Sequence, residues 1–575
     1  MADSFNGIEQ FHDQQEGRAE DSNPNKRYHI KYRVSEKPEW HEGWFTITEL
    51  IDKIGTDFIV GLGCHNYIPP LQDIAPNLKV LIVRDLYDQS GLRDLSKLTR
   101  LEVLDLSGNS FSGGLPDVIG DLGNLKMLNL NACKLTSLPE SFSKLTRLEE
   151  LELSGNIFSG GLSDVFGNLG NLKKLKLYRC ELTSLPETFS KLTRLEELHL
   201  PENNFSSGLP DVFGDLGNLK KLILDTCKLT SLPESLSKLT RLEELNLSGN
   251  YSFGGLPDVF GDLGNLKMLN LNACKLTSLP ESFSKLTRLE VLDLQWNNFS
   301  SGLPDVFGYL GNLKKLNLDI CELTSLPETF SKLTRLEELY LSRNNFSSGL
   351  PDVFGDLGNL KKLNLDRCEL TSLAESFSKL TRLEELHLSE NNFSSGLPDV
   401  FGDLGNLKKL ILGACKLTYL PETFSKLTQL EELHLSGNNF SSGLPDVFGD
   451  LGNLKMLILG TCELTSLPES LSKLTRLEDL DLSGNRFSSG LPDVFGDLGN
   501  LKKLNLDACR LTSLPESSSK LTRLKELKLS GNNFFGGLPD LFGGFGTKLF
   551  PGMFHSSKFL SSFMIYSFSK LTQIG

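Results

Sequence analysis

The sequence predicts an α/β solenoid of horseshoe type: about twenty stacked coils, with a concave parallel β-sheet and short helices or turns on the convex side. Three observations predict this fold. Nine of the ten cysteines recur every 47 residues, each period divides into a coil of 24 residues and one of 23, and both coils open with the same leucine pattern. Because a lone coil cannot bury its apolar face, the coils must stack into one elongated unit.

The chain before the repeats has two parts. Residues 1–27 are acidic and polar and lack the apolar core of a signal peptide, so we expect a disordered segment. Residues 28–77 do not repeat. Within them, residues 28–34 alternate apolar and polar side chains as a strand does, and residues 48–54 are typical of a short helix that ends at Gly55. Together we expect residues 28–77 to form an N-terminal cap over the first coil.

Residues 78–547 form the predicted solenoid. A first coil spans 78–100, nine pairs of a long and a short coil span 101–523, and a last long coil spans 524–547. In the coil that begins at Leu148, Leu151 and Leu153 alternate with polar residues, as expected of a strand with one buried face. In the following coil, residues 185–192 space their apolar residues at helical intervals, and Pro186 suits a first helical turn.

Three further rows of residues fit the stacking. A phenylalanine row in the long coils is expected in the core, and ten asparagines, beginning with Asn109, Asn156 and Asn203, are expected to satisfy backbone groups at the bend after each strand. The periodic cysteines take the equivalent place in the short coils. The phenylalanines are Phe158, Phe205, Phe299, Phe346, Phe393, Phe440 and Phe487.

The cysteine row is predicted to be reduced and structural. Consecutive cysteines are two strands apart, roughly 10 Å, whereas a disulfide needs Cα atoms within about 7 Å. That spacing is also too wide for a shared zinc ion. We therefore favour small buried residues with a weak S–H donor, which suit a reducing compartment.

Residues 548–575 are a degenerate repeat or an apolar tail. They carry five phenylalanines, and Ser567 to Thr572 resemble the SFSKLT segment of the repeat. A decayed coil, a poor cap and a truncated gene model are all compatible with this composition.

The repeats resemble the leucine-rich repeat family. Both coils open with L-x-x-L-x-L-x-x-[N/C], and the match covers residues 78–547. The short coil is similar to repeats of intracellular Ras-associated and scribble-type scaffold proteins, and the long coil to repeats of plant-type receptor ectodomains. The resemblance implies protein binding.

Charge in the coils is arranged as a ladder. At the second position the sign alternates between neighbouring coils, as in Glu149, Lys173, Glu196 and Lys220. On adjacent parallel strands these residues are expected to pair and to set the register between coils. The net charge of −14 disfavours nucleic-acid binding, which usually requires a basic face.

No catalytic, cofactor or metal-binding motif is present, so we expect a protein that is not an enzyme. Gly61-Leu-Gly63 lacks the rest of a nucleotide-binding loop, and no G-x-S-x-G motif occurs. No apolar run reaches the length of a membrane span. These features, with the free thiols, predict a cytoplasmic protein. A gene model that lacks the true start would change that prediction.

Candidate binding residues come from position five of each coil, which lies between two buried leucines and is predicted to face solvent on the concave side. This row is mostly polar near the N-terminus, beginning with Asp105, and changes after residue 340. Selection for a partner and neutral drift both explain such variation, and we favour a binding surface. The candidate partner-binding residues are Trp296, Tyr340, Arg343, His387, Ile411, His434 and Ile458.

Two functions follow from this surface. The first is a non-enzymatic scaffold or adaptor that binds a protein or peptide on the concave face in intracellular signalling. The alternative is an innate-immune-type recognition module or a fragment of a larger receptor.

His387 and His434 are two strands apart, too far to share a metal directly.

Overall fold

The computed structural model describes residues 28–34, 41–45, 59–65, 68, 71, 75–86, 90–251, 253 and 255–534. The chain divides into two compact units, residues 1–204 (unit 1) and 205–575 (unit 2). The predicted disordered segment 1–27, the predicted helix at 48–54 and the tail 548–575 lie outside the described residues.

Unit 1 begins with three strands: β1 (Tyr28–Val34), β2 (His41–Phe45) and β3 (Ile59–His65). The strand predicted at residues 28–34 is confirmed, whereas β2 and β3 were not predicted. β1 pairs antiparallel with both β2 and β3, and β3 runs parallel to the first repeat strand, β4. Gly61 and Gly63 therefore belong to a strand. A side chain at Gly63 would come within 3.3 Å of the Lys31 Cβ on β1.

In the repeats of unit 1 each coil has one strand, and the coils of β4 through β8 also have one 3-10 turn of five or eight residues. The strands are parallel from β3 through β9. They are β4 (Val80–Arg84), β5 (Val103–Asp105), β6 (Met127–Asn129), β7 (Glu150–Glu152), β8 (Lys174–Lys176) and β9 (Glu197–His199). The turns are η3 (Ser90–Lys97), η4 (Asp117–Asp121), η5 (Glu140–Lys144), η6 (Asp164–Asn168) and η7 (Glu187–Lys191).

Unit 2 repeats the same pattern, with parallel pairing from β10 through β23. Its strands are β10 (Lys221–Ile223), β11 (Glu244–Asn246), β12 (Met268–Asn270), β13 (Val291–Asp293), β14 (Lys315–Asn317), β15 (Glu338–Tyr340), β16 (Lys362–Asn364), β17 (Glu385–His387), β18 (Lys409–Ile411), β19 (Glu432–His434), β20 (Met456–Ile458), β21 (Asp479–Asp481), β22 (Lys503–Asn505) and β23 (Glu526–Lys528).

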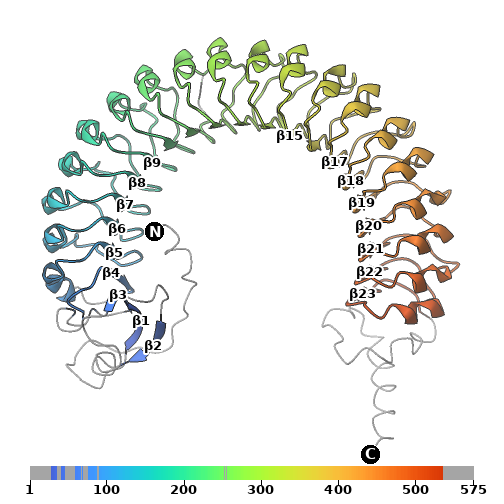
Figure 1. Cartoon of the computed structure of the whole chain (residues 1–575), viewed down its shortest axis with the longest axis horizontal. Helices are drawn as coiled ribbons and strands as arrows, with labels where there is room; N and C mark the ends of the chain where they lie inside the picture. Colours follow the sequence, from blue (N-terminus) through green and yellow to red (C-terminus); the bar gives the residue numbers. More distant parts are fainter. Residues whose placement is uncertain are drawn as a thin grey trace, which may run out of the picture. The chain divides into compact units, whose positions relative to one another are not determined.

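The 3-10 turns of unit 2 are η8 (Asp211–Asp215), η9 (Glu234–Lys238), η10 (Asp258–Asp262), η11 (Glu281–Lys285), η12 (Asp305–Tyr309), η13 (Glu328–Lys332), η14 (Asp352–Asp356), η15 (Glu375–Lys379), η16 (Asp399–Asp403), η17 (Glu422–Lys426), η18 (Asp446–Asp450), η19 (Glu469–Lys473), η20 (Asp493–Asp497) and η21 (Glu516–Lys520). Within unit 2 the strands line the concave side and the turns form the convex side (Figure 1). The predicted solenoid architecture is confirmed.

The convex segments are 3-10 turns because each is short and closes with i→i−3 bonds. In η7 the Phe189 N–H donates to the Pro186 carbonyl (3.0 Å), and the Leu192 N–H donates to the Phe189 carbonyl (2.9 Å). Pro186 has φ −68° and ψ 151° and lies just before the turn, one residue earlier than expected. Phe189 is buried against Phe166 of the preceding coil, with ring centroids 5.1 Å apart.

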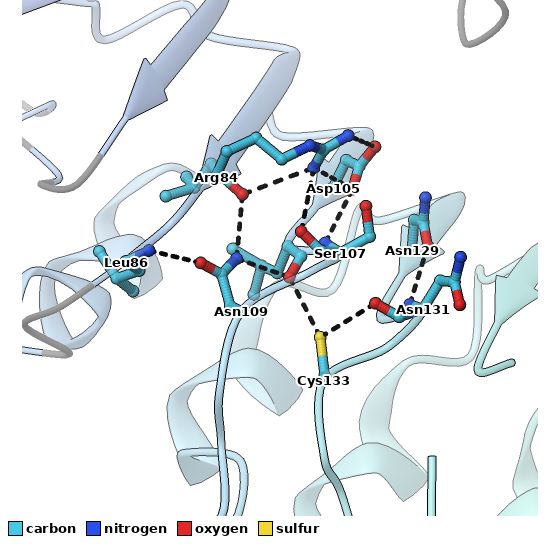
Figure 2. A network of polar contacts seen from close by, with 10 residues as sticks. Arg84, Leu86, Asp105, Ser107, Asn109, Asn129, Asn131 and Cys133 are labelled. Carbon is cyan, nitrogen blue, oxygen red and sulfur yellow. Dashed lines mark hydrogen bonds and ion pairs between the residues drawn. The ribbon is translucent and has the colours of Figure 1, made fainter. Parts of the chain in front are cut away.

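The asparagine row satisfies backbone groups at the bend, as predicted. Figure 2 shows the first example: the Asn109 amide donates to the carbonyls of Val83 (3.0 Å) and Leu106 (2.6 Å), and its oxygen accepts the Leu86 N–H (2.6 Å). Nine of the ten asparagines are at most 5% exposed. Because each amide bonds to backbone of its own coil and of the preceding one, the row joins the coils as well as the bends.

The cysteines have the structural role predicted for them. The Cys133 thiol is fully buried and donates to the Leu106 carbonyl at 3.1 Å (Figure 2). Burial raises its pKa to about 12, so the thiolate is disfavoured at neutral pH. All ten cysteines are buried and free.

The charged ladder is also present, and its two rows alternate. The gap between β15 and β16 is bridged at position two by Glu337 and Lys361 (2.7 Å), and the next gap is bridged at position three by Lys362 and Glu385 (3.2 Å). These pairs are largely exposed, so each contributes about 0–1 kcal/mol. Their main effect is that carboxylates neutralise the lysine charges along the sheet.

The alternation of buried and half-buried positions gives a stability prediction. Leu245, in β11, is 1% exposed, and Asn246 beside it is half-buried on the concave side. We expect Leu245→Ala to lower the free energy of unfolding by about 2–5 kcal/mol, through lost burial and a cavity. Asn246→Ala should change it by less than about 0.5 kcal/mol. Chemical denaturation followed by circular dichroism measures both, and equal losses would contradict this assignment of faces.

Candidate functional site

The candidate residues at position five form one continuous row across neighbouring strands. The sheet register pairs Tyr340 with Asn364, Asn364 with His387, His387 with Ile411, Ile411 with His434, and His434 with Ile458. All six side chains are half-buried rather than fully exposed. We call this row, from Tyr340 to Ile458, the concave stripe. Its residues lie side by side because the parallel coils differ by whole repeats and keep the same phase.

Tyr340 is held in place by charged neighbours on its own and the preceding strand. Its hydroxyl donates to Glu338 Oε2 at 2.9 Å, and the ammonium of Lys315 lies 5.1 Å from the ring centroid. Burial, followed by the hydrogen bond to Glu338, raises the pKa of Tyr340 to about 12. The phenol is therefore neutral at physiological pH, and its ring is already oriented before a partner binds.

His387 is oriented by two carboxylates. Its Nε2 lies 3.0 Å from Glu385 Oε1, and its Nδ1 lies 3.9 Å from Asp366 Oδ2. Glu385 in turn pairs with Lys362 at 3.2 Å. This imidazole is thus part of a polar network within the stripe, next to the isoleucine-containing half.

His434 has different surroundings. It lies between Ile411 and Ile458, and its Nε2 is buried without a hydrogen-bond partner in the part of the chain that the structure describes. Burial lowers the pKa of His434, and the charges of Lys409 and His387 lower it further, against the opposing effect of Glu432 and Asp479. The neutral imidazole is therefore the form that suits this apolar end of the stripe.

This depressed pKa gives a prediction of pH dependence. Because the folded state binds the His434 proton more weakly than the unfolded chain does, this residue's contribution to stability is complete above the unfolded pKa, near 6.5. It is lost as pH falls through the folded value. We expect the urea midpoint to drop between pH 7.5 and pH 5.5 by less in His434→Gln than in the native sequence. The same drop in both proteins would show that His434 does not contribute.

Trp296 and Arg343 lie at position eight, three residues beyond the row, after strands β13 and β15. Both have left-handed backbone, with φ +59° and +56°. Trp296 is 56% exposed, and Arg343 is also exposed. Glycine occupies this position in six of the ten long coils. Large side chains here carry a conformational cost that glycine avoids, and this favours a role outside the core.

One expectation for position five is wrong. Asp105, in β5 of unit 1, was expected to face solvent, but its side chain is 0% exposed. The Arg84 guanidinium covers it and pairs with both carboxylate oxygens, at 2.6 and 2.8 Å (Figure 2). The sequence offered one signal for this, an arginine at position seven of the preceding coil, where most later coils carry smaller or acidic residues.

Sequence reasoning missed the row at position seven, which borders the stripe. Asp319 and Asp366 each accept a backbone N–H of the following coil at 2.6 Å, from Ser342 and Ser389. Burial raises the pKa of both aspartates. Farther along, the row is formed by small residues: Gly413, Ser436, Gly460 and Ser483.

The described residues contain neither a candidate metal site nor a candidate membrane span. No group of three or more histidine, cysteine, aspartate or glutamate side chains there is arranged to hold a metal ion. Within those same residues, no helix has the length and apolarity that crossing a membrane requires.

Comparisons with known families identify the repeats. A model described as "Leucine-rich repeat region" matches residues 59–180 and 257–396, and one described as "Leucine rich repeat" matches 194–251 and 381–440. A two-copy model, "Leucine Rich repeats (2 copies)", matches 499–543, and a single-repeat model matches 241–263 and 476–498. A search among curated proteins gave no match.

Solved structures show the same architecture. A leucine-rich repeat protein of Leptospira interrogans is 30% identical, with 72% of this chain and 92% of that chain covered and a TM-score of 0.53. The TDR receptor is 27% identical, with 84% and 85% covered and a TM-score of 0.56. Toll from Drosophila, in its complex with Spatzle, is 21% identical, with 82% and 64% covered and a TM-score of 0.57. This last likeness concerns the fold alone.

Proposed function

The chain belongs to the leucine-rich repeat family, and from that premise we propose that it is a non-enzymatic scaffold or adaptor that binds a protein or peptide on its concave face. The observation that carries this proposal is the concave stripe. It places an aromatic ring, two imidazoles and two isoleucines on neighbouring strands. Such a surface can bury apolar area while its polar groups fix the partner's orientation.

The proposed site consists of the concave stripe with Trp296 and Arg343. Tyr340 and Trp296 are the anchors, Ile411 and Ile458 supply apolar area, and Arg343 supplies hydrogen bonds or stacking. Aromatic residues and arginine are over-represented among residues that dominate binding energies. The proposal places the chain in the cytoplasm, in signalling and without nucleic-acid ligands. The buried free thiols and the net charge of −14 support that assignment.

Substitution in the stripe tests the site. Tyr340→Ala should weaken binding of a captured protein partner by about 2 kcal/mol or more, as expected for a central aromatic anchor. Tyr309→Ala is the matched control, because Tyr309 is 63% exposed at the end of convex turn η12. Titration calorimetry with the purified partner measures both affinities. A loss in Tyr309→Ala with none in Tyr340→Ala would move the site off the concave face.

His434→Ala extends the same test to the other end of the stripe. Its control is His199→Ala, at position five of the β9 coil in unit 1. If neither Tyr340→Ala nor His434→Ala changes affinity, drift explains the variation along this row better than selection does.

A recognition module of a larger receptor is the second candidate function. The likeness to the TDR receptor, at 27% identity over 84% of this chain, favours it. Sequencing full-length transcripts separates the two candidates. A signal peptide, or a nucleotide-binding or death-type domain encoded on the same transcript, would favour the receptor.

A further inference from the structure

We propose that the concave stripe selects a peptide segment with a basic residue at each end and two apolar residues between them. This inference rests on the proposed function and concerns the chemistry of the partner. It follows from how charge is distributed over the floor of the concave face. We define this floor as positions five and seven of the coils from β13 to β22.

The floor carries negative charge at both ends. On one side lie Asp293, Asp319 and Asp366, and on the other Asp481 and Asp507. No lysine or arginine occupies either position anywhere along the floor. These aspartates are half-buried. None of them forms an ion pair with a lysine or arginine of the described residues, although the His387 imidazole lies 3.9 Å from Asp366.

The lysines of this face do not offset the floor. They lie at positions two and three, where carboxylates of neighbouring coils bind them, as Glu338 binds Lys315 (3.1 Å) and Glu432 binds Lys409 (3.0 Å). At the edge, Arg367 pairs with Glu390. Arg343 is exposed and has no ion pair among the described residues, and it lies at position eight, outside the floor.

The middle of the floor is uncharged, and its side chains at position seven are short. Ile411, His434 and Ile458 stand at position five, and small residues stand at position seven. A side chain added at Gly413 would come within 3.5 Å of Ser389 Oγ, and one at Gly460 within 3.2 Å of Ser483 Oγ, so these small residues are packed side by side. A ligand can approach the backbone here and bury apolar side chains beside the isoleucines.

The spacing sets the length of the segment. Asp366 belongs to the coil of β16 and Asp481 to β21, five strand spacings apart, or about 24 Å at ~4.8 Å per strand. An extended peptide spans that distance in roughly seven or eight residues. Ile411 and Ile458 lie two and four strands beyond Asp366, which places the apolar residues about three and six positions after the first basic one. The segment therefore has two basic residues about seven positions apart, with two apolar residues between them.

Selection from a displayed library of random nine-residue peptides tests this pattern. The full chain is the target, and a triple variant, Tyr340→Ala with Ile411→Ala and Ile458→Ala, identifies peptides that depend on the stripe. We expect stripe-dependent peptides to be enriched in arginine or lysine at both ends around an apolar pair. Neutral or acidic stripe-dependent peptides would overturn the inference and leave the proposed function standing. A failure to recover any stripe-dependent peptide would overturn both.

A charge-matched pair of variants then locates the contacts. Asp366→Asn with Asp481→Asn keeps an oxygen for the N–H groups of Ser389 and Ser483 but removes two charges from the floor. Affinity for a selected peptide, measured by fluorescence anisotropy, should fall about tenfold or more. Asp352→Asn with Asp446→Asn removes two exposed charges from the convex turns η14 and η18 and should change it less than twofold. Equal effects of the two pairs would show that net charge, not the floor, attracts the peptide.

Discussion

Replacing Asn344 by alanine should lower the free energy of unfolding by about 4 kcal/mol, although the side chain is small and uncharged. Asn344 is 4% exposed, and its amide makes four hydrogen bonds to backbone. The oxygen accepts the N–H groups of Cys321 (3.1 Å) and Leu323 (2.9 Å), and the nitrogen donates to the carbonyls of Leu318 (2.8 Å) and Leu341 (2.7 Å). Each buried group left without a partner costs about 1–3 kcal/mol, reduced where water enters the space.

The loss should be local as well as large, because each coil contacts mainly its neighbours. Hydrogen exchange of peptides that cover residues 313–350 measures the opening of this part directly and does not require two-state unfolding of the whole chain. Asn345→Ala, at the exposed neighbouring residue, is the control and should leave exchange unchanged. Slow exchange retained in Asn344→Ala would show that the backbone groups find other partners.

Asn344→Cys should be less costly than Asn344→Ala. Cysteine fills the equivalent position of the short coils, where its thiol lies near two backbone carbonyls, as that of Cys368 does near Leu341 (3.1 Å) and Asp366 (3.6 Å), with one proton to donate. A thiol can restore one weak bond but cannot replace the amide oxygen that accepts two N–H groups. This difference explains why the long coils carry asparagine at a bend that serves two coils at once.

The regular part of the fold could be predicted from the sequence because its signals are repeated. The leucine spacing, the asparagine row and the alternating charges each recur in many coils, so the strand phase at Leu245 follows from the average of many copies. For the short convex segments, the sequence did not decide between helices and turns. Their five-residue length and i→i−3 bonds decide for 3-10 turns, which periodicity alone does not distinguish from one helical turn.

The parts that the sequence did not predict are those that occur once. β2 and β3 have no second copy with which to compare them, and their pairing with β1 depends on contacts across 28–65 that no local pattern encodes.

In the candidate site, position five could be found from its phase. The acidic and small residues of position seven could not, since their neighbours belong to other coils and become visible only when the coils are stacked.

Asp105 is the sharpest example of a feature that occurs once. A period-two pattern places it on the solvent side, and it does lie on that face, yet the longer side chain of Arg84 folds over it and excludes water. The carboxylate also accepts the Ser107 N–H at 2.9 Å (Figure 2). The pair therefore joins the first coil to the second through a buried charge that has no equivalent among the described residues of the later coils.

Arg84→Ala should consequently destabilise the start of the solenoid by about 3–5 kcal/mol, because it leaves the Asp105 carboxylate buried without its counter-charge. Arg93→Ala, at an exposed arginine of η3, removes the same charge and should cost less than about 0.5 kcal/mol. The double variant Arg84→Met with Asp105→Leu separates two causes of the lost stability. One is the buried carboxylate left without a counter-charge, and the other is the loss of the ion pair itself. If the orphaned charge causes it, two apolar residues of similar size should recover most of the stability. Hydrogen exchange across residues 78–110 measures all three proteins. A double variant no more stable than Arg84→Ala would show instead that the first coil depends on the ion pair itself, through the fixed geometry of its two charged hydrogen bonds.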